Sequence, residues 1–166
     1  MATVLRPGER DFKEVPGKID NFRVFSDMSR INKGIDPKNL NFDVRRLDPG
    51  QFSSVYHFHR YAEEMFVMIS GTATLRTMNG LETVESGDII FCEMGEAGAH
   101  QLYNHTSEPC VYLDIRSYIE YDVCEYPDSN KLLIAPTMEI FDRDAQLGYF
   151  EGEENIRDIW RKIEDK

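Results

Sequence analysis

The chain has 166 residues, of which 41% are hydrophobic and 11% aromatic, which is typical of one globular domain with its own core. Its formal net charge of -11 would repel nucleic-acid phosphates and anionic lipid surfaces, since its 19 lysines and arginines are dispersed. We therefore expect a single domain, with neither nucleic acid nor a membrane as a partner.

The sequence carries no segment of the kind that directs a chain to or across a membrane. The N-terminal MATVLRPGERDFKEV lacks an apolar run, and nowhere do about 18 apolar residues follow one another. Cys92, Cys110 and Cys124 are odd in number and form no CxxC, so we expect free buried thiols. These features predict a cytoplasmic protein.

Short segments rich in β-branched and aromatic residues follow one another from about residue 22 to residue 117. Asn79-Gly80 is the strongest turn signal between them and predicts a type I′ hairpin, which needs positive φ at both turn positions. Closely spaced strands without intervening helices predict an all-β antiparallel sandwich or barrel. The predicted strands cover residues 22–26, 42–47, 54–60, 64–70, 72–78, 81–85, 88–93, 99–105 and 110–117.

The C-terminal part of the chain has a different pattern. Ile156, Ile159, Trp160 and Ile163 recur at the spacing of one helical face, with charged residues between them. We expect a short amphipathic helix packed on the barrel itself, with packing on a partner subunit as the alternative. The expected domain thus has a core barrel over about 40–117, an N-terminal strand segment over 1–39 and a C-terminal extension with the helix over 118–166.

The stretch VYHFHRYAEEMFVMISG places two of the four histidines, His57 and His59, two positions apart. On a strand, side chains at i and i+2 share a face with bases about 6 to 7 Å apart, so both imidazoles can reach one ion. On a helix the same spacing would direct them to nearly opposite sides. Because the surrounding sequence predicts a strand, we interpret the pair as metal ligands.

Two further residues complete the predicted metal site. Glu64 begins the next predicted strand, so its carboxylate can reach the same point. In AHQLYNH, His100 shares a face with Leu102 and Asn104, whereas His105 falls on the opposite face. We therefore predict a three-histidine, one-carboxylate site made by His57, His59, Glu64 and His100, with His105 outside it.

The sequence around these ligands resembles the two motifs of the cupin superfamily, G(X)5HXH(X)3-4E(X)6G and G(X)5PXG(X)2H(X)3N. In the first motif one extra residue precedes His57; in the second, Glu93 replaces the proline and the loop before His100 is two residues longer. The resemblance covers about residues 40–116. The matching positions are Gly50, His57, His59, Glu64 and Gly71, and then Gly87, Gly95, His100 and Asn104.

This resemblance implies a double-stranded β-helix, or jelly-roll barrel, with a metal near one mouth and commonly a homodimer. The segments GAHQLYNHTSEPCVYLDI and DVCEYPDSNKLL look like a branch of small single-domain cupins, some of which carry a sugar-phosphate-isomerase label. We accordingly expect one cupin domain that forms a homodimer.

The predicted ligand set suits one divalent transition metal, Fe, Mn, Ni, Co or Zn, without choosing among them. Four protein ligands leave one or two coordination positions open, as in catalytic sites. Metal binding needs neutral imidazoles and an ionised Glu64, so we expect metal loss below about pH 6. Residues that share faces with the ligands should line the cavity beside the metal: Phe66, Met68, Leu102 and Asn104.

We expect a metal-dependent enzyme acting on a small organic molecule, as a dioxygenase, decarboxylase, lyase or isomerase. The alternatives are a non-catalytic protein that binds a sugar or carboxylate, and a barrel whose histidines bind no metal. A sugar phosphate would require inward basic residues; Arg45, Arg46 and Arg76 are the nearby ones, and we expect each at the surface. The sequence identifies no catalytic proton donor or acceptor.

Overall fold

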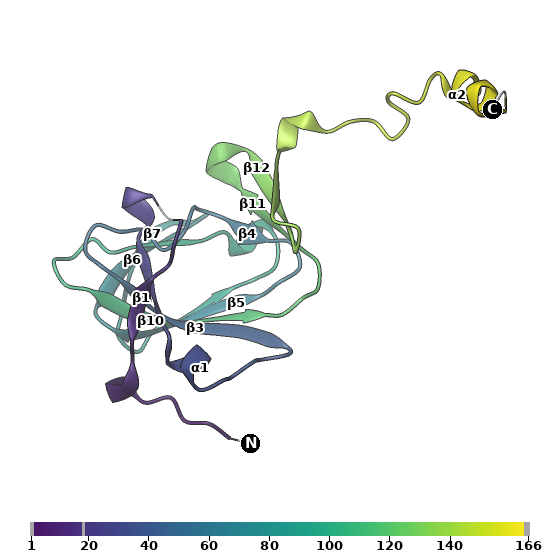
Figure 1. The fold of residues 1–166 in the computed structure, drawn as a ribbon. Coiled ribbons are helices and arrows are strands. Elements are labelled where there is room, and N and C mark those ends of the chain that lie inside the picture. The colour runs from purple at the N-terminus through teal and green to yellow at the C-terminus, as the bar shows by residue number, and fades with distance from the viewer. Residues whose placement is uncertain (1, 18, 165–166) are drawn as a thin grey trace.

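The computed structural model describes residues 2–17 and 19–164, and most of these form a β barrel with two facing layers (Figure 1). One layer is a six-stranded antiparallel sheet. Its strands, in spatial order, are β1 (Phe12–Glu14), β2 (Val24–Asp27), β3 (Leu40–Leu47), β10 (Cys110–Ser117), β5 (Glu64–Ser70) and β8 (Ile89–Cys92). The facing sheet consists of β7 (Gly80–Glu85), β6 (Thr72–Thr77) and β9 (Gln101–Tyr103).

A four-stranded sheet lies against one end of this barrel (Figure 1). It consists of β13 (Glu139–Asp142), β12 (Lys131–Ala135), β11 (Asp122–Tyr126) and β4 (Phe58–His59). The α-helices are α1 (Ser29–Asn32) and α2 (Ile156–Glu164). Short 3₁₀ turns are η1 (Pro7–Glu9), η2 (Asp20–Phe22), η3 (Glu96–Gly98), η4 (Pro127–Ser129) and η5 (Arg143–Ala145).

The hydrophobic core lies between the two facing sheets, because the apolar positions of both alternate toward the interior. Each large aliphatic or aromatic side chain buried here contributes about 1.5–3 kcal/mol to stability. The core contains Val24, Leu47, Phe66, Met68, Ala73, Leu75, Val84, Ile90, Cys92, Leu102, Cys110 and Tyr112.

The registers of β3, β10 and β5 order the inward side chains into rows across the large sheet. Directly paired residues of antiparallel strands point to the same face, so each row brings together one side chain from each strand. From the end covered by β4 and β11 inward, the rows are Asn41–Arg116–Glu64, Asp43–Asp114–Phe66, Arg45–Tyr112–Met68 and Leu47–Cys110. The barrel interior therefore changes from polar at this mouth to apolar at the far end.

The all-β fold predicted from the sequence is confirmed, and two predicted strands coincide with β5 and β10. The segment 54–60 is not one continuous strand: only β4 forms, and His57 makes an isolated bridge with His100. The hairpin after β6 forms as predicted, but the prediction of a type I′ turn is wrong. Thr77 pairs with Gly80, and neither of the two intervening residues has a positive φ.

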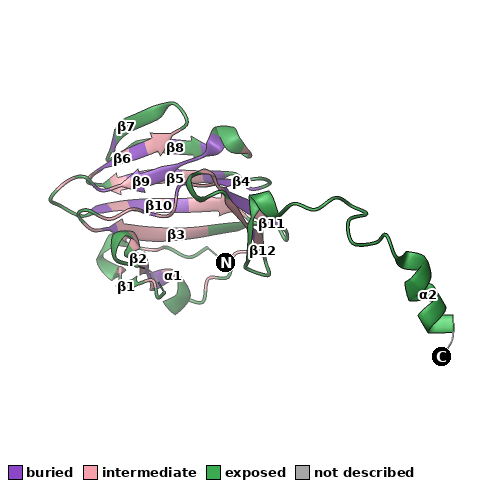
Figure 2. Cartoon of the chain, turned by 90° about the horizontal axis from the view of Figure 1, so that it is seen from above, coloured by how far each residue is buried: buried purple, intermediate pink, exposed green. Residues whose placement is uncertain are grey.

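The C-terminal helix forms as predicted, but its expected packing on the barrel is wrong. Figures 1 and 2 show α2 at the end of an extended segment that carries it away from both layers. Its apolar face is uncovered, with Trp160 61% exposed. The physical reason is the segment over 143–155, which pairs with no strand and is exposed throughout, so nothing holds the helix to the sheet.

Two further expectations concern the cysteines and membrane association. Cys92, Cys110 and Cys124 are free and buried, as predicted. Among the helices of residues 2–17 and 19–164, none has the length and apolarity needed to cross a membrane.

Candidate metal centre

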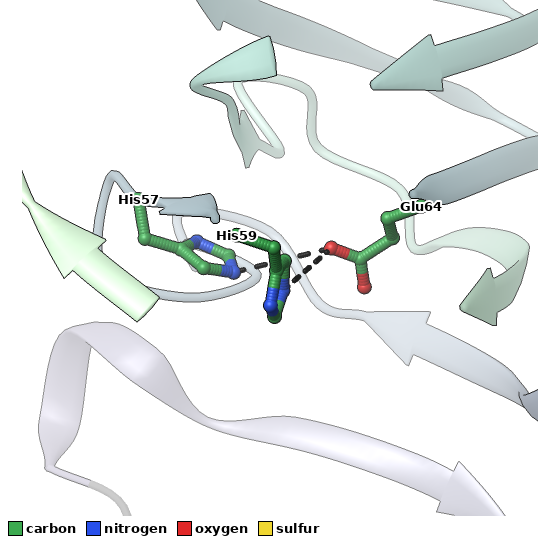
Figure 3. A group of neighbouring side chains, drawn as sticks. All are labelled: His57, His59 and Glu64. Atoms are coloured by element: carbon green, nitrogen blue, oxygen red, sulfur yellow. Dashed lines mark ion pairs between the residues drawn. The ribbon is translucent and has the colours of Figure 1, made fainter. Parts of the chain in front are cut away.

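Three imidazoles and one carboxylate converge at the polar mouth of the barrel, and Figure 3 shows two of the imidazoles, His57 and His59, beside the Glu64 carboxylate. The atom Oε2 of Glu64, the first residue of β5, lies 3.1 Å from Nε2 of His100 and 3.3 Å from Nε2 of His59. Nε2 of His57 lies 3.9 Å from the same oxygen. The structure thus brings together the four residues that the sequence indicated, from β4, β5 and the segments before β4 and β9.

Each imidazole is held through its other ring nitrogen, Nδ1. His57 Nδ1 lies 2.9 Å from the carbonyl oxygen of Val55, and His100 Nδ1 lies 2.8 Å from that of Gly98. A carbonyl oxygen only accepts hydrogen bonds, so in both rings Nδ1 carries a proton and donates it. This tautomer leaves Nε2, which faces Glu64, available as a ligand atom.

His59 has a different anchor, a carboxylate supplied by β11. Its Nδ1 lies 2.5 Å from Oδ2 of Asp122 and 3.2 Å from the sulfur of Cys124. Pairing of β11 with β4 places Cys124 directly opposite His59, which brings this anchor to the ring. A carboxylate behind a histidine orients the ring and makes its opposite nitrogen a better metal ligand.

The polar atoms at the centre of this group fit a divalent cation. Nε2 of His59, Nε2 of His100 and Oε2 of Glu64 are buried and lack a partner with hydrogen-bond geometry. Buried polar atoms are normally paired, so three unpaired atoms facing one point indicate a missing partner. Ligand atoms of His57, His59 and Glu64 also lie within 4.8 Å of one another, and nitrogen and oxygen donors suit transition metals.

Protons compete with a cation for this centre. Burial opposes protonation of His59, but Asp122, Cys124 and Glu64 outweigh it and raise its pKa to about 11. Burial likewise opposes protonation of His100, whose pKa is raised to about 10 by Cys92 and Glu64. Burial lowers the pKa of His57 to about 3. The Glu64 and Asp122 carboxylates therefore favour positive charge at His59 and His100, which a proton or a bound cation can supply.

Two of the cavities that adjoin the four converging residues meet at the barrel mouth. The larger, about 320 Å³, touches His57 and His59 and extends between the barrel mouth and the strands β11 and β12. The smaller, about 200 Å³, touches Glu64 and lies over β3 and β10. Both are lined by Asn41 and Arg116.

Buried charged groups continue inward from Glu64. Asp114 lies 3.1 Å from a terminal nitrogen of Arg45, whose Nε is also 3.7 Å from Asp43. Burial raises the pKa of the Asp114 carboxyl to about 7, against the opposing effect of Arg45 and with the help of Glu64. The sequence predicted Arg45 at the surface; its side chain is half-buried, with 34% exposed, because its place in the inward row of β3 directs it to Asp114.

The four residues expected to line the cavity beside the metal are not among those that line either cavity. Phe66, Met68 and Leu102 belong to the closed core, although the Phe66 ring packs edge-on against His100 at 5.2 Å. Asn104 is fully buried and donates to the carbonyl oxygens of Leu47 and Glu108, so it holds a loop. Strand alternation correctly gave their inward direction, but these positions lie deeper than the mouth.

His105 lies outside the centre, as expected, and its Nδ1 is 2.8 Å from the hydroxyl of Thr74. The sequence reasoning missed Asp122, Cys124, Asp114 and Arg116. A signal for the first two was present, because DVCEY alternates as a strand does and puts both on one face. Nothing in the sequence indicated that this strand pairs with the one that carries His59.

Residues 44–116, which include the three histidines and Glu64, match the family model described as a cupin domain. The barrel has the cupin fold. The chain is similar to a solved putative sugar phosphate isomerase from Acidithiobacillus ferrooxidans, with 25% identity, a TM-score of 0.69, and coverage of 77% of this chain and 81% of that chain.

Two other solved structures share this fold. A sugar phosphate isomerase of the cupin superfamily from Silicibacter pomeroyi is 18% identical, with a TM-score of 0.73 and coverage of 89% of this chain and 98% of that chain. A polyketide cyclase from Streptomyces resistomycificus is 16% identical, with a TM-score of 0.55 and coverage of 70% and 80%. Comparison with curated proteins found no match.

Proposed function

We propose that this cupin is a metal-dependent enzyme that acts on a small organic molecule. One observation supports the proposal above all: three imidazoles are anchored through Nδ1 with their Nε2 atoms directed at the Glu64 carboxylate. Such preorganisation of ligand atoms is costly, since it buries polar atoms without partners. A bound cation would pair with these atoms and so offset the cost of burying them.

His57, His59, Glu64 and His100 would hold one divalent transition metal, and the larger cavity would give a small molecule access to it from the histidine side. When bound, the metal would act as a Lewis acid on an oxygen of the substrate or activate a water molecule. The protein would orient the ligands through Val55, Gly98 and Asp122 and exclude bulk water.

The cavity wall supplies groups that can position the substrate. Tyr126 lies beside His57, with ring centroids 6.1 Å apart, and burial raises its pKa to about 12. Its hydroxyl therefore stays protonated at neutral pH and can donate a hydrogen bond to a bound molecule. Leu133 and Met138 add apolar surface to the same wall.

Among the reaction types expected for such a centre, isomerisation has the most support. The solved structure with 25% identity is described as a putative sugar phosphate isomerase. A Lewis acid next to a half-buried pocket suits proton transfer beside a carbonyl group, and it equally suits decarboxylase, lyase or dioxygenase chemistry. The metal that the protein carries separates these outcomes, because iron with oxygen uptake indicates a dioxygenase.

Elemental analysis of the protein purified without added metal tests the proposal. We expect about one transition-metal ion per chain in the wild type and in His105→Ala, and a large loss in His100→Ala. His105→Ala is the matched control because that histidine lies outside the centre. Equal metal content in all three proteins would contradict the ligand assignment. A metal-loaded protein that binds small acids or sugars but converts none of a substrate panel would indicate a binding protein.

A further inference from the structure

Arg116 stands in the same inward row as Glu64. On β10 it pairs directly with Glu64 of β5 on one side and with Asn41 of β3 on the other. Paired residues of antiparallel strands share a face, so the guanidinium is directed into the same mouth as the four converging residues. It is half-buried there and lines both cavities.

Neighbouring arginines have partners that Arg116 lacks. Arg45 pairs with Asp114 and Asp43 in the interior, and Arg46 pairs with Asp48 on the outer face. Within residues 2–17 and 19–164, the side chain of Arg116 makes neither an ion pair nor a hydrogen bond. The donors of this half-buried guanidinium are therefore available to a ligand that enters either cavity.

Arg116 lies between the two cavities, and each cavity extends from it to one or more of the proposed metal ligands. The larger cavity reaches from Arg116 to His57 and His59, and the smaller reaches from it to Glu64. Asn41 lines both cavities and adds an amide to the same row. Arg30 lines the smaller cavity, and its Nε is buried without a hydrogen-bond partner.

We propose that Arg116, together with Asn41, forms an anion-binding subsite beside the metal centre, and that the ligand of this cupin carries a carboxylate or phosphate group. The planar guanidinium can donate two parallel hydrogen bonds to either anion. The subsite fixes the charged end of the ligand and leaves its other end facing the histidines. This inference rests on the proposed function for the role of the metal, but anion binding at Arg116 can be measured by itself.

Isothermal titration calorimetry of the full chain with inorganic phosphate and with malonate tests the subsite, with glycerol as the uncharged comparison. We expect wild-type protein to bind at least one anion and not glycerol. Arg116→Gln should weaken that binding about tenfold or more, because a bidentate charged contact is lost. Arg116→Lys should bind the anion more weakly than the wild type and more tightly than Arg116→Gln, because lysine keeps the charge but not the planar pair of donors.

Arg76→Gln is the matched control, because this arginine of β6 pairs with Asp128 of η4, away from Arg116. It should bind the anions as the wild type does. Tighter binding of phosphate than of malonate would assign a phosphorylated ligand, and the reverse a carboxylate. Wild-type protein that binds neither anion, unchanged binding in Arg116→Gln, or an equal loss in Arg76→Gln would overturn the proposal.

Metal content measured on the same samples separates this inference from the proposed function. Arg116→Gln should keep the wild-type metal content and thermal midpoint, because Arg116 is not one of the four proposed ligands. Wild-type protein that contains metal but binds no anion would contradict the subsite and not the metal-dependent function. Protein that contains no metal but binds anions through Arg116 would contradict the metal-dependent function and support the subsite.

Discussion

Oδ2 of Asp122 lies 2.5 Å from Nδ1 of His59, across 63 residues of sequence. The same carboxylate also accepts hydrogen bonds from the backbone N–H groups of Tyr61 and Val123 through Oδ1, which fixes its orientation. Asp122 is therefore a positioning residue for the imidazole rather than one of the four proposed metal ligands.

Replacing Asp122 by Ala should weaken metal binding about 10- to 100-fold, because the ring loses both its orientation and the charge behind it. Competition with a chromogenic chelator measures this affinity. Asp128→Ala is the control, since that aspartate is exposed and pairs with Arg76 away from the centre. An Asp122→Ala protein that is folded and binds metal as tightly as the wild type would refute the role.

Metal retention should fall with falling pH. His59 and His100 have raised pKa values in the protein alone, so protons occupy the ligand nitrogens more strongly as the solution becomes acidic. We expect the apparent metal affinity to fall progressively as the pH falls below these raised values, and the metal to be lost below about pH 6. Elemental analysis after desalting across a pH series measures this. Full retention at about pH 4.5 would contradict the ligand assignment.

Gly98 couples the loop before β9 to the metal centre. A Cβ at this position would lie 1.9 Å from the carbonyl oxygen of Glu93, and the carbonyl oxygen of Gly98 anchors His100. Gly98→Ala must therefore shift the loop and move the anchor. We expect a lower thermal midpoint together with reduced metal content.

Gly8→Ala is the matched control for Gly98→Ala, because an added Cβ there meets no atom within 4 Å. It should leave both quantities unchanged. Gly98→Ala protein with wild-type thermal midpoint and metal content would show that the loop relaxes without disturbing His100.

Asp27 should contribute to stability in a pH-dependent way. Burial raises the pKa of this carboxyl, but hydrogen bonds from Ser29 and from the backbone N–H of Asp11 outweigh it, so the pKa is lowered overall. A lowered folded-state pKa gives stability that is present above the unfolded value and is lost as pH falls through the folded value.

Asp27→Ala should therefore cost about 2 kcal/mol of unfolding free energy at pH 7, and less at about pH 3. Urea denaturation at the two pH values measures the difference. Asp36→Ala is the control, because Asp36 is exposed and pairs only with Lys38 at the surface. A loss that is as large at the acidic pH as at pH 7 would mean that the charge of Asp27 is not involved.

Removal of the chain after Gly148 should leave the barrel intact. The helix α2 and the segment before it are exposed throughout the described residues, so they add little to its stability. We expect the thermal midpoint to change by less than about 2 °C, since no buried contact is lost. A large fall, or a change of oligomeric state seen by light scattering, would show that the apolar face of α2 is covered in solution.

Strand alternation made most of the barrel predictable, because buried and partly exposed residues alternate along most of β5 and β10. The same alternation separates His100 from His105 in the sequence. Alternation did not predict how far a side chain lies from the mouth of the barrel. Phe66 faces inward like Glu64, but it lies two residues farther along the strand and about 7 Å deeper.

Residues brought in by strand pairing could not be predicted in this way. Arg116 meets Glu64 only through the register of β10 with β5, and Asp122 meets His59 only through the pairing of β11 with β4. Neither register is encoded in a local pattern. The hydrophobic spacing of α2 correctly predicted a helix, but spacing alone carries no information on what the helix packs against.

One side of the larger cavity comes from a different part of the chain than the four converging residues. Leu133, Ala135 and Met138 belong to β12 and the turn after it, whereas the histidines and Glu64 precede residue 101. Exchange of side chains on that hairpin can widen or narrow the entrance without moving the four converging residues. A scaffold arranged in this way can change the shape of the molecule it admits through a single short segment.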